Sequence, residues 1–134
     1  MKKTMTAALL CSFASLSAFA STDYTCALTQ TFAGNAPELR TEKSDVSVEH
    51  SFFDGNNLVV YVYGKSSGLA PDKIPLNALQ PDAEATPGEL YYGDYTVDAG
   101  LLSGAATGTI LINKAPLLGM GSAIDFTLNC QLVQ

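Results

Sequence analysis

The sequence predicts an all-β protein, a small antiparallel β-barrel or sandwich of about six to eight strands with its first and last strands joined by one disulfide bond. Three observations lead to this fold class. Apolar and polar residues alternate with a period of two in several segments, as in half-buried strands. No segment shows the apolar periodicity of a helix of three turns, and two cysteines lie near the ends of the chain that remains after export.

The first twenty residues have the pattern of an export signal. Lys2 and Lys3 precede an uncharged, mostly apolar stretch that ends in Ala18-Phe19-Ala20, where small residues suit a signal peptidase. We therefore expect cleavage after Ala20, one mature domain over 21–134, and a location in the bacterial periplasm or outside the cell. The apolar stretch is shorter than the roughly 20 residues of a membrane-spanning helix, and no later segment reaches that length unbroken.

Signal cleavage also removes Cys11, which leaves Cys26 and Cys130 as an even pair in an oxidising compartment. We expect these two to form the disulfide, which closes a loop of about 100 residues and is worth about 4.7 kcal/mol in the chain-entropy model. A reactive or metal-binding thiol pair is the alternative, and the wide separation of the two cysteines counts against it. A lipid-modified Cys11 is disfavoured because it follows two leucines in mid-signal.

The charge balance narrows the classes of partner. The chain has 13 acidic and 7 basic residues, and the loss of Lys2 and Lys3 with the signal leaves a net charge of −8. Nucleic acids and anionic lipids bind through surfaces rich in Lys and Arg, so neither is an expected partner. A basic protein or a glycan is a better candidate. An acidic balance also keeps an exported monomer soluble, and a monomer is what we expect.

The strands at the two ends of the mature chain are the clearest. In the segments 24–32 and 124–132 the apolar residues alternate with polar ones, and both cysteines fall on the apolar faces. The first and last strands are therefore expected to be neighbours, or to face each other across a sandwich. Between them, 46–52 and 58–63 flank the turn sequence 53–57, which contains Asp-Gly and Asn residues, and these two segments predict a hairpin.

Two further strands and one long loop complete the predicted fold. Leu90–Val97 and Thr107–Asn113 are the strands, and 36–43 and 99–104 are candidates for short additional ones. The segment 64–89 contains four prolines and is expected to be a long loop with one helical turn around Leu76–Leu79; loops of this length are either functional or disordered. An outer-membrane barrel is disfavoured, because it needs at least eight strands of about 9 to 11 residues.

The candidate binding face is formed by tyrosines. Five of the six tyrosines lie on two candidate strands that flank the long loop, and the proposed face consists of Tyr61, Tyr63, Tyr91 and Tyr95. If Leu58, Val60 and Val62 face the core, Tyr61 and Tyr63 project away from it and form a platform for a sugar ring or for another protein. The alternative is that both faces of this hairpin are covered and the tyrosines are ordinary half-buried β-formers.

No motif predicts catalysis, and we expect no enzyme, no cofactor and no metal. His50 is the one histidine in the chain, and its place between Val48 and Phe52 on an apolar face favours a core or rim residue over a general base. No G-x-S-x-G nucleophile elbow is present. The carboxylate pairs Glu38 with Glu42 and Asp94 with Asp98 are weak candidates for acid–base work or calcium.

One resemblance suggests a concrete function. The segment Tyr24-Thr25-Cys26 at the mature start, a second cysteine at the end and the acidic balance resemble the small periplasmic lysozyme inhibitors, which are disulfide-closed β-barrels. The serine-glycine-tyrosine segment expected of them is absent, since Ser66-Ser67-Gly68 is followed by Leu69. The first hypothesis is therefore an exported binding protein for a protein or glycan, with an inhibitor of a basic hydrolase such as lysozyme as one version. The alternatives are a carrier with a small apolar ligand inside the barrel, and an unrecognised hydrolase that uses His50.

Overall fold

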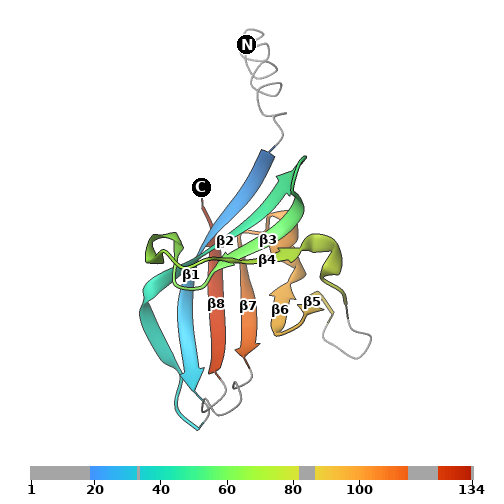
Figure 1. Ribbon diagram of the computed structural model, residues 1–134. Helices are drawn as coiled ribbons and strands as arrows, with labels where there is room; N and C mark the ends of the chain where they lie inside the picture. The colour runs from blue at the N-terminus through green and yellow to red at the C-terminus, as the bar shows by residue number, and fades with distance from the viewer. Residues whose placement is uncertain (1–18, 33, 82–86, 115–123, 134) are drawn as a thin grey trace, which may run out of the picture.

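The computed structural model describes residues 19–32, 34–81, 87–114 and 124–133. Eight antiparallel strands in these ranges form one sheet that curls into a nearly closed barrel (Figure 1). The strands are β1 (Phe19–Phe32), β2 (Glu38–Ser51), β3 (Gly55–Tyr61), β4 (Asp72–Pro75), β5 (Glu89–Tyr92), β6 (Tyr95–Asp98), β7 (Thr107–Lys114) and β8 (Ile124–Leu132). Three short 3-10 helices lie between strands, η1 (Lys65–Ser67), η2 (Leu76–Ala78) and η3 (Ala99–Ser103). The all-β prediction is confirmed.

The sheet order is β4-β3-β2-β1-β8-β7-β6-β5, so strands that follow one another in the chain are neighbours everywhere except between β4 and β5. The first and last strands meet in the middle of this order, as predicted. Cys26 and Cys130 lie directly opposite each other in the β1–β8 ladder and form the disulfide. The disulfide thus joins β1 to β8 on one side of the barrel, and the opening of the barrel lies on the other side, between β4 and β5.

Inward-facing side chains fill the barrel. Tyr24, Cys26 and Leu28 of β1 and Leu128 and Cys130 of β8 are each at most 2% exposed, which confirms the predicted apolar faces. Further buried core residues come from β2, β3, β4, β6, β7 and β8 and from η3, and they include Val46, Val48, Leu58, Val60, Ile74, Val97, Ile110, Ile112 and Phe126. The described interior is therefore occupied by packed side chains, as is usual for a small barrel.

Helix η3 closes one end of the barrel. The side chain of Leu101 is fully buried over Gly108, where a Cβ atom would lie only 2.5 Å from Leu101 Cδ2. The hydroxyl of Tyr24 donates to the carbonyl oxygens of Leu101, at 3.1 Å, and Ala105, at 2.8 Å. These contacts hold the segment 99–104 across the barrel end as a 3-10 helix, so the suggestion of a short strand there is wrong.

Two other predictions need correction. The segment Leu90–Val97 is a hairpin of two strands, β5 and β6, because the chain reverses at Gly93-Asp94, with φ of +55° at Gly93. The described part of the segment predicted as a loop, 64–81, contains η1, β4 and η2, so it is not a loop throughout. The predicted helical turn is confirmed as η2, and the strand suggested at 36–43 is the first part of β2.

The predicted export signal lies almost wholly outside the described residues, which begin at Phe19. In the β1–β2 ladder, Phe19 lies opposite Ser51 and Ala20 lies opposite His50. Cleavage after Ala20 would remove these two pairs and leave Ser21 opposite Glu49 as the first pair. The apolar core positions of β1, Tyr24, Cys26 and Leu28, all follow Ser21. Among the described residues, no helix has the length and apolar character needed to cross a membrane.

Candidate binding site

Two tyrosines, Tyr61 at the end of β3 and Tyr63 just after it, lie at the barrel rim. Tyr61, at the end of β3, is half-buried, and Lys65 Nζ lies 5.8 Å from the centre of its ring. Tyr63 follows the strand and is also half-buried, with its ring packed edge-on against Phe126 at 6.1 Å between centroids. Val59 is as buried as Leu58 and Val60. Both faces of this part of β3 are therefore covered, and the two tyrosines do not form a free outer platform.

The tyrosines of the β5–β6 hairpin point in different directions. Tyr91 is half-buried and its hydroxyl donates to Glu89 at 2.9 Å. Tyr92, in the next position, is 44% exposed. Tyr95 is only 5% exposed and belongs to the core, because the turn at Gly93 breaks the expected single strand and resets which residues face inward. Tyr95 therefore contributes its ring from inside the barrel.

Between β4 and β5 there is no ladder, and only a few contacts span the gap. Gln80 and Tyr91 form an isolated backbone bridge, with N–H to carbonyl distances of 3.1 and 2.8 Å. The Tyr95 hydroxyl donates to Asp72 Oδ2 on β4. We call the opening between β4 and the β5–β6 hairpin, with the hollows that adjoin it, the tyrosine seam.

Two hollows meet at the tyrosine seam. The first has a volume of about 200 Å³ and is lined by Tyr61, Tyr63 and mainly apolar side chains. The second, of about 350 Å³, lies between β4 and the β5–β6 turn and is lined by Tyr92 and Tyr95. Asp72 and Lys114 line both hollows. The structure thus brings three of the four predicted face residues together, adds Tyr92 to them, and places Tyr91 outside both hollows.

A small polar cluster forms the wall that the hollows share. Lys114 Nζ lies 3.9 Å from Asp72 Oδ2 and 5.9 Å from the centre of the Tyr95 ring. Burial, and then the hydrogen bond to Asp72, raises the pKa of the Tyr95 phenol well above its ordinary value. Tyr95 therefore stays protonated and donates to Asp72, which fixes the position of that carboxylate. Sequence reasoning did not identify Asp72 or Lys114, because they come from distant strands and carry no local motif.

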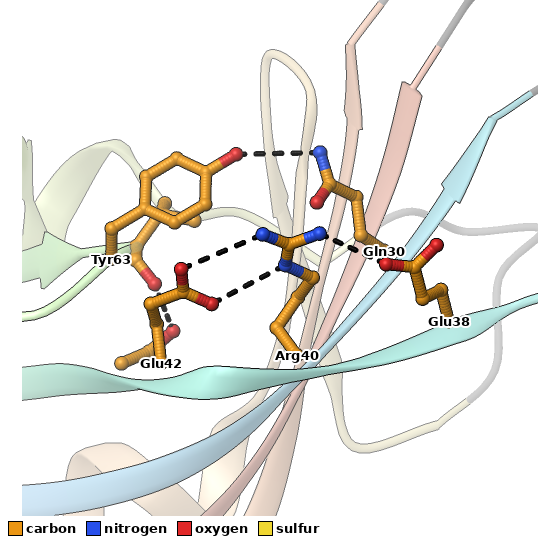
Figure 2. A network of polar contacts seen from close by, with 7 residues as sticks. Gln30, Glu38, Arg40, Glu42 and Tyr63 are labelled. Atoms are coloured by element: carbon orange, nitrogen blue, oxygen red, sulfur yellow. Dashed lines mark hydrogen bonds and ion pairs between the residues drawn. The ribbon is translucent and has the colours of Figure 1, made fainter.

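Polar residues continue from the first hollow along the barrel rim (Figure 2). Gln30 is 7% exposed, and its Nε2 atom donates to the Tyr63 hydroxyl at 3.3 Å. On β2, Arg40 pairs with Glu38 at 2.9 Å and with Glu42 at 3.3 Å. The hydrogen bond with Glu42 raises the pKa of Arg40, while a backbone hydrogen bond, followed by the one with Arg40, lowers the pKa of Glu42. These exposed ion pairs contribute little to stability.

The other residues considered for catalysis do not assemble into a site. His50 is exposed near the outer end of β2, beyond the last core residue of that strand, so of the two expected places, core or rim, the core is excluded. Glu38 and Glu42 both bind Arg40, and Asp98 caps η3 by accepting from the Gly100 N–H at 3.0 Å. In the described ranges no three His, Cys, Asp or Glu side chains come together in a way that could hold a metal ion.

The tyrosine seam is also bordered by most of the basic side chains that the predicted cleavage would leave in the chain. Five basic residues remain after the predicted cleavage, and three of them border the seam: Lys65 near the Tyr61 ring, Lys73 in the second hollow and Lys114 between the two hollows. Comparisons with protein-family models, with curated proteins and with solved structures find no match for this chain. The functional argument therefore rests on the geometry and chemistry of the seam.

Proposed function

We propose that this chain is an exported, non-enzymatic binding protein that recognises a protein or a glycan at the tyrosine seam. The observation that carries the proposal is the arrangement of four tyrosines around two adjoining hollows that share the Asp72–Lys114 pair. Tyrosine rings supply a large contact area with few rotatable bonds, and such rings dominate the binding energy of many interfaces. A carboxylate and an ammonium group fixed beside them provide directional contacts.

Another hollow in the structure has less support as a binding site. It has a volume of about 550 Å³ and lies around Thr25, Thr109, Asn129 and the neighbouring positions of β1, β7 and β8. No aromatic ring lines it, and its walls combine threonine, asparagine and glutamine residues with the charged Lys43 and Asp98 and the two disulfide cysteines. Although it is larger than either hollow of the seam, it lacks an apolar anchor, and such anchors distinguish binding sites from ordinary polar surface.

An inhibitor of a basic hydrolase such as lysozyme is the most concrete version of this function with a protein partner. The expected net charge of −8 would accelerate encounter with a cationic enzyme over the whole surface. Since the seam itself is bordered by lysines, the attraction would come from the carboxylates elsewhere, and the tyrosines would supply the contact. Association should then slow as salt is added, and a rate that is independent of salt would contradict this version.

The second candidate, a carrier with an apolar ligand inside the barrel, has weaker support. Core side chains occupy the described interior, many of them fully buried. The apolar hollow at the seam, about 200 Å³, is smaller than the range of about 300–1,000 Å³ typical of ligand sites. A carried ligand would have to displace core side chains, and lipid that purifies with the protein would be the sign of such a function.

Native mass spectrometry of the mature protein, purified from its own host, tests the proposal. We expect a protein or saccharide adduct that is lost in Tyr92→Ala and retained in the control Phe53→Ala. Both rings are exposed, 44% for Tyr92 and 80% for Phe53, but Phe53 lies in the β2–β3 turn, away from the seam. The absence of an adduct, or an adduct that survives Tyr92→Ala, would overturn the proposal.

A further inference from the structure

We infer that the ligand of the tyrosine seam is a neutral oligosaccharide whose neighbouring sugar units occupy the two hollows. This inference rests on the proposed function and specifies its ligand. The two hollows, of about 200 and 350 Å³, together fall within the range of about 300–1,000 Å³ typical of small-molecule sites. Since they meet at Asp72 and Lys114, a chain of two linked units can pass from one hollow to the other along a shared polar wall.

The aromatic walls fit the apolar side of a sugar ring. A pyranose has a face of C–H groups and a rim of hydroxyls, so it needs both an aromatic surface and hydrogen-bonding groups beside it. The first hollow supplies the rings of Tyr61, Tyr63 and Phe126, and the second supplies Tyr92 and Tyr95. Tyr92 is 44% exposed and Tyr61 and Tyr63 are half-buried, while Phe126 and Tyr95 lie behind them at 8% and 5% exposure. Each hollow therefore has at least one ring that a bound unit can contact.

The polar groups of the seam are already held in position and still have hydrogen-bonding capacity. Asp72 Oδ2 accepts from Tyr95, while Oδ1 accepts no hydrogen bond among the described residues, and the side chain is 47% exposed. The oxygen of Tyr63 accepts from Gln30, which leaves its own proton to donate. The Lys114 side chain is 43% exposed, and its ammonium group has further donors. Hydroxyl groups of a sugar can both donate to the carboxylate and accept from the other two.

The charge of the seam and the prolines at β4 favour a neutral saccharide over an anionic chain or an added peptide strand. The charged groups that line the two hollows are two carboxylates, Asp72 and Asp94, and two ammonium groups, Lys73 and Lys114, so the hollows are close to neutral although Lys65 lies beside Tyr61. The expected net charge of −8 on the whole mature chain repels anionic chains. A peptide that adds a strand to the edge of β4 is opposed by Pro71 and Pro75, since proline has no N–H to donate. A protein that binds over this surface remains an outcome of the test.

Titration with defined sugars tests the inference. The probes are the neutral tetrasaccharides of glucose, α- and β-linked, and of N-acetylglucosamine, with tetragalacturonate as the anionic control and a basic lysozyme as the protein control. Binding is followed by calorimetry and by tyrosine emission, which is informative because the chain contains no tryptophan. We expect at least one neutral tetrasaccharide to bind with an affinity that is unchanged between low and high salt.

Two variants at the seam and one away from it locate the binding. Tyr92→Ala and Tyr61→Ala should each weaken binding of the neutral sugar roughly tenfold, because each removes an aromatic contact. Phe53→Ala should leave the affinity within about twofold, because its exposed ring lies in the β2–β3 turn. Thermal unfolding of each variant should show one cooperative transition well above the assay temperature, with a lower midpoint for Tyr61→Ala because that ring is half-buried. Such a transition shows that the change in affinity is not due to unfolding.

The outcomes separate this inference from the proposed function. If no neutral tetrasaccharide binds more tightly than about 1 mM while lysozyme binds in a manner that depends on Tyr92, the inference is wrong and the proposed function stands. If tetragalacturonate binds in preference to the neutral sugars, the inference is also wrong. If neither sugars nor lysozyme bind, or if the affinity is the same in the seam variants as in the wild type, both proposals fail.

Discussion

Removal of the disulfide should lower the stability of the barrel chiefly through the unfolded chain. Cys26 and Cys130 are 104 positions apart in the sequence, and they lie opposite each other in a ladder that runs from Tyr24–Leu132 to Phe32–Ile124. The ladder brings the two positions together whether or not the sulfurs are bonded. The bond therefore changes mainly the freedom of the unfolded chain, where it closes a loop of about 100 residues.

The expected size of the effect follows from that loop. The chain-entropy model gives about 4.7 kcal/mol for a loop of about 100 residues, a large part of the roughly 5–15 kcal/mol net stability of a typical domain. The variant Cys26→Ala/Cys130→Ala should lose about that amount, and somewhat more because both sulfurs are buried. Its m-value should rise, because an unfolded chain without the cross-link exposes more surface.

Urea unfolding of the mature protein, followed by circular dichroism, measures both quantities. The wild type is compared with and without reductant, and the double variant serves as the control that reductant should not affect. A loss of stability below about 1 kcal/mol, or an unchanged m-value, would refute the reasoning. It would mean that the unfolded chain already holds the two ends together.

Three further predictions concern the barrel end, the buried phenol and the exposed turn. Gly108→Ala should cost about 1–3 kcal/mol in urea unfolding, because its Cβ would meet Leu101, and the added cost should shrink in a Leu101→Ala background. The raised pKa of Tyr95 means that its contribution to stability is complete below the ordinary tyrosine pKa of about 10 and declines as the pH rises beyond it. Tyr95→Phe should flatten that decline when unfolding is measured at alkaline pH. An equally steep decline in the variant would show that another group causes it. Phe53→Ser should change the unfolding free energy by no more than about 0.5 kcal/mol, because the ring is 80% exposed; a larger loss would show an unseen packing partner.

Much of the fold could be predicted because several strands bury only one face. In β1 and β8 the apolar residues alternate strictly, so the pattern identified both the strands and the inward position of the two cysteines. The strand β4 was not predicted because four residues are too few to show alternation. Its proline also counts against a strand in the sequence, although a proline is tolerated at the edge of a sheet. The reversal at Gly93-Asp94 did leave a signal, since a glycine-aspartate pair is a common two-residue turn, but apolar residues on both sides concealed it.

The candidate site was harder to predict than the fold. The inward position of Gln30 continues the alternation of β1, but its partner Tyr63 is 33 positions away and is brought near only by the pairing of β1, β2 and β3. Asp72 and Lys114 meet because the curvature of the whole sheet brings β4 close to the end of β7. Local sequence contains no information on that closure, so the tyrosines could be identified as a group while their shared polar wall could not.

The central claim, that ligands bind at the tyrosine seam, can be tested by an amide chemical-shift map of the mature protein with bound tetrasaccharide or lysozyme. The account predicts that the largest shifts lie in 60–64, 69–74 and 92–95 and at Lys114, which surround the two hollows. Shifts centred on the β2–β3 turn, or on the outer faces of β1, β7 and β8 around the polar hollow, would contradict it.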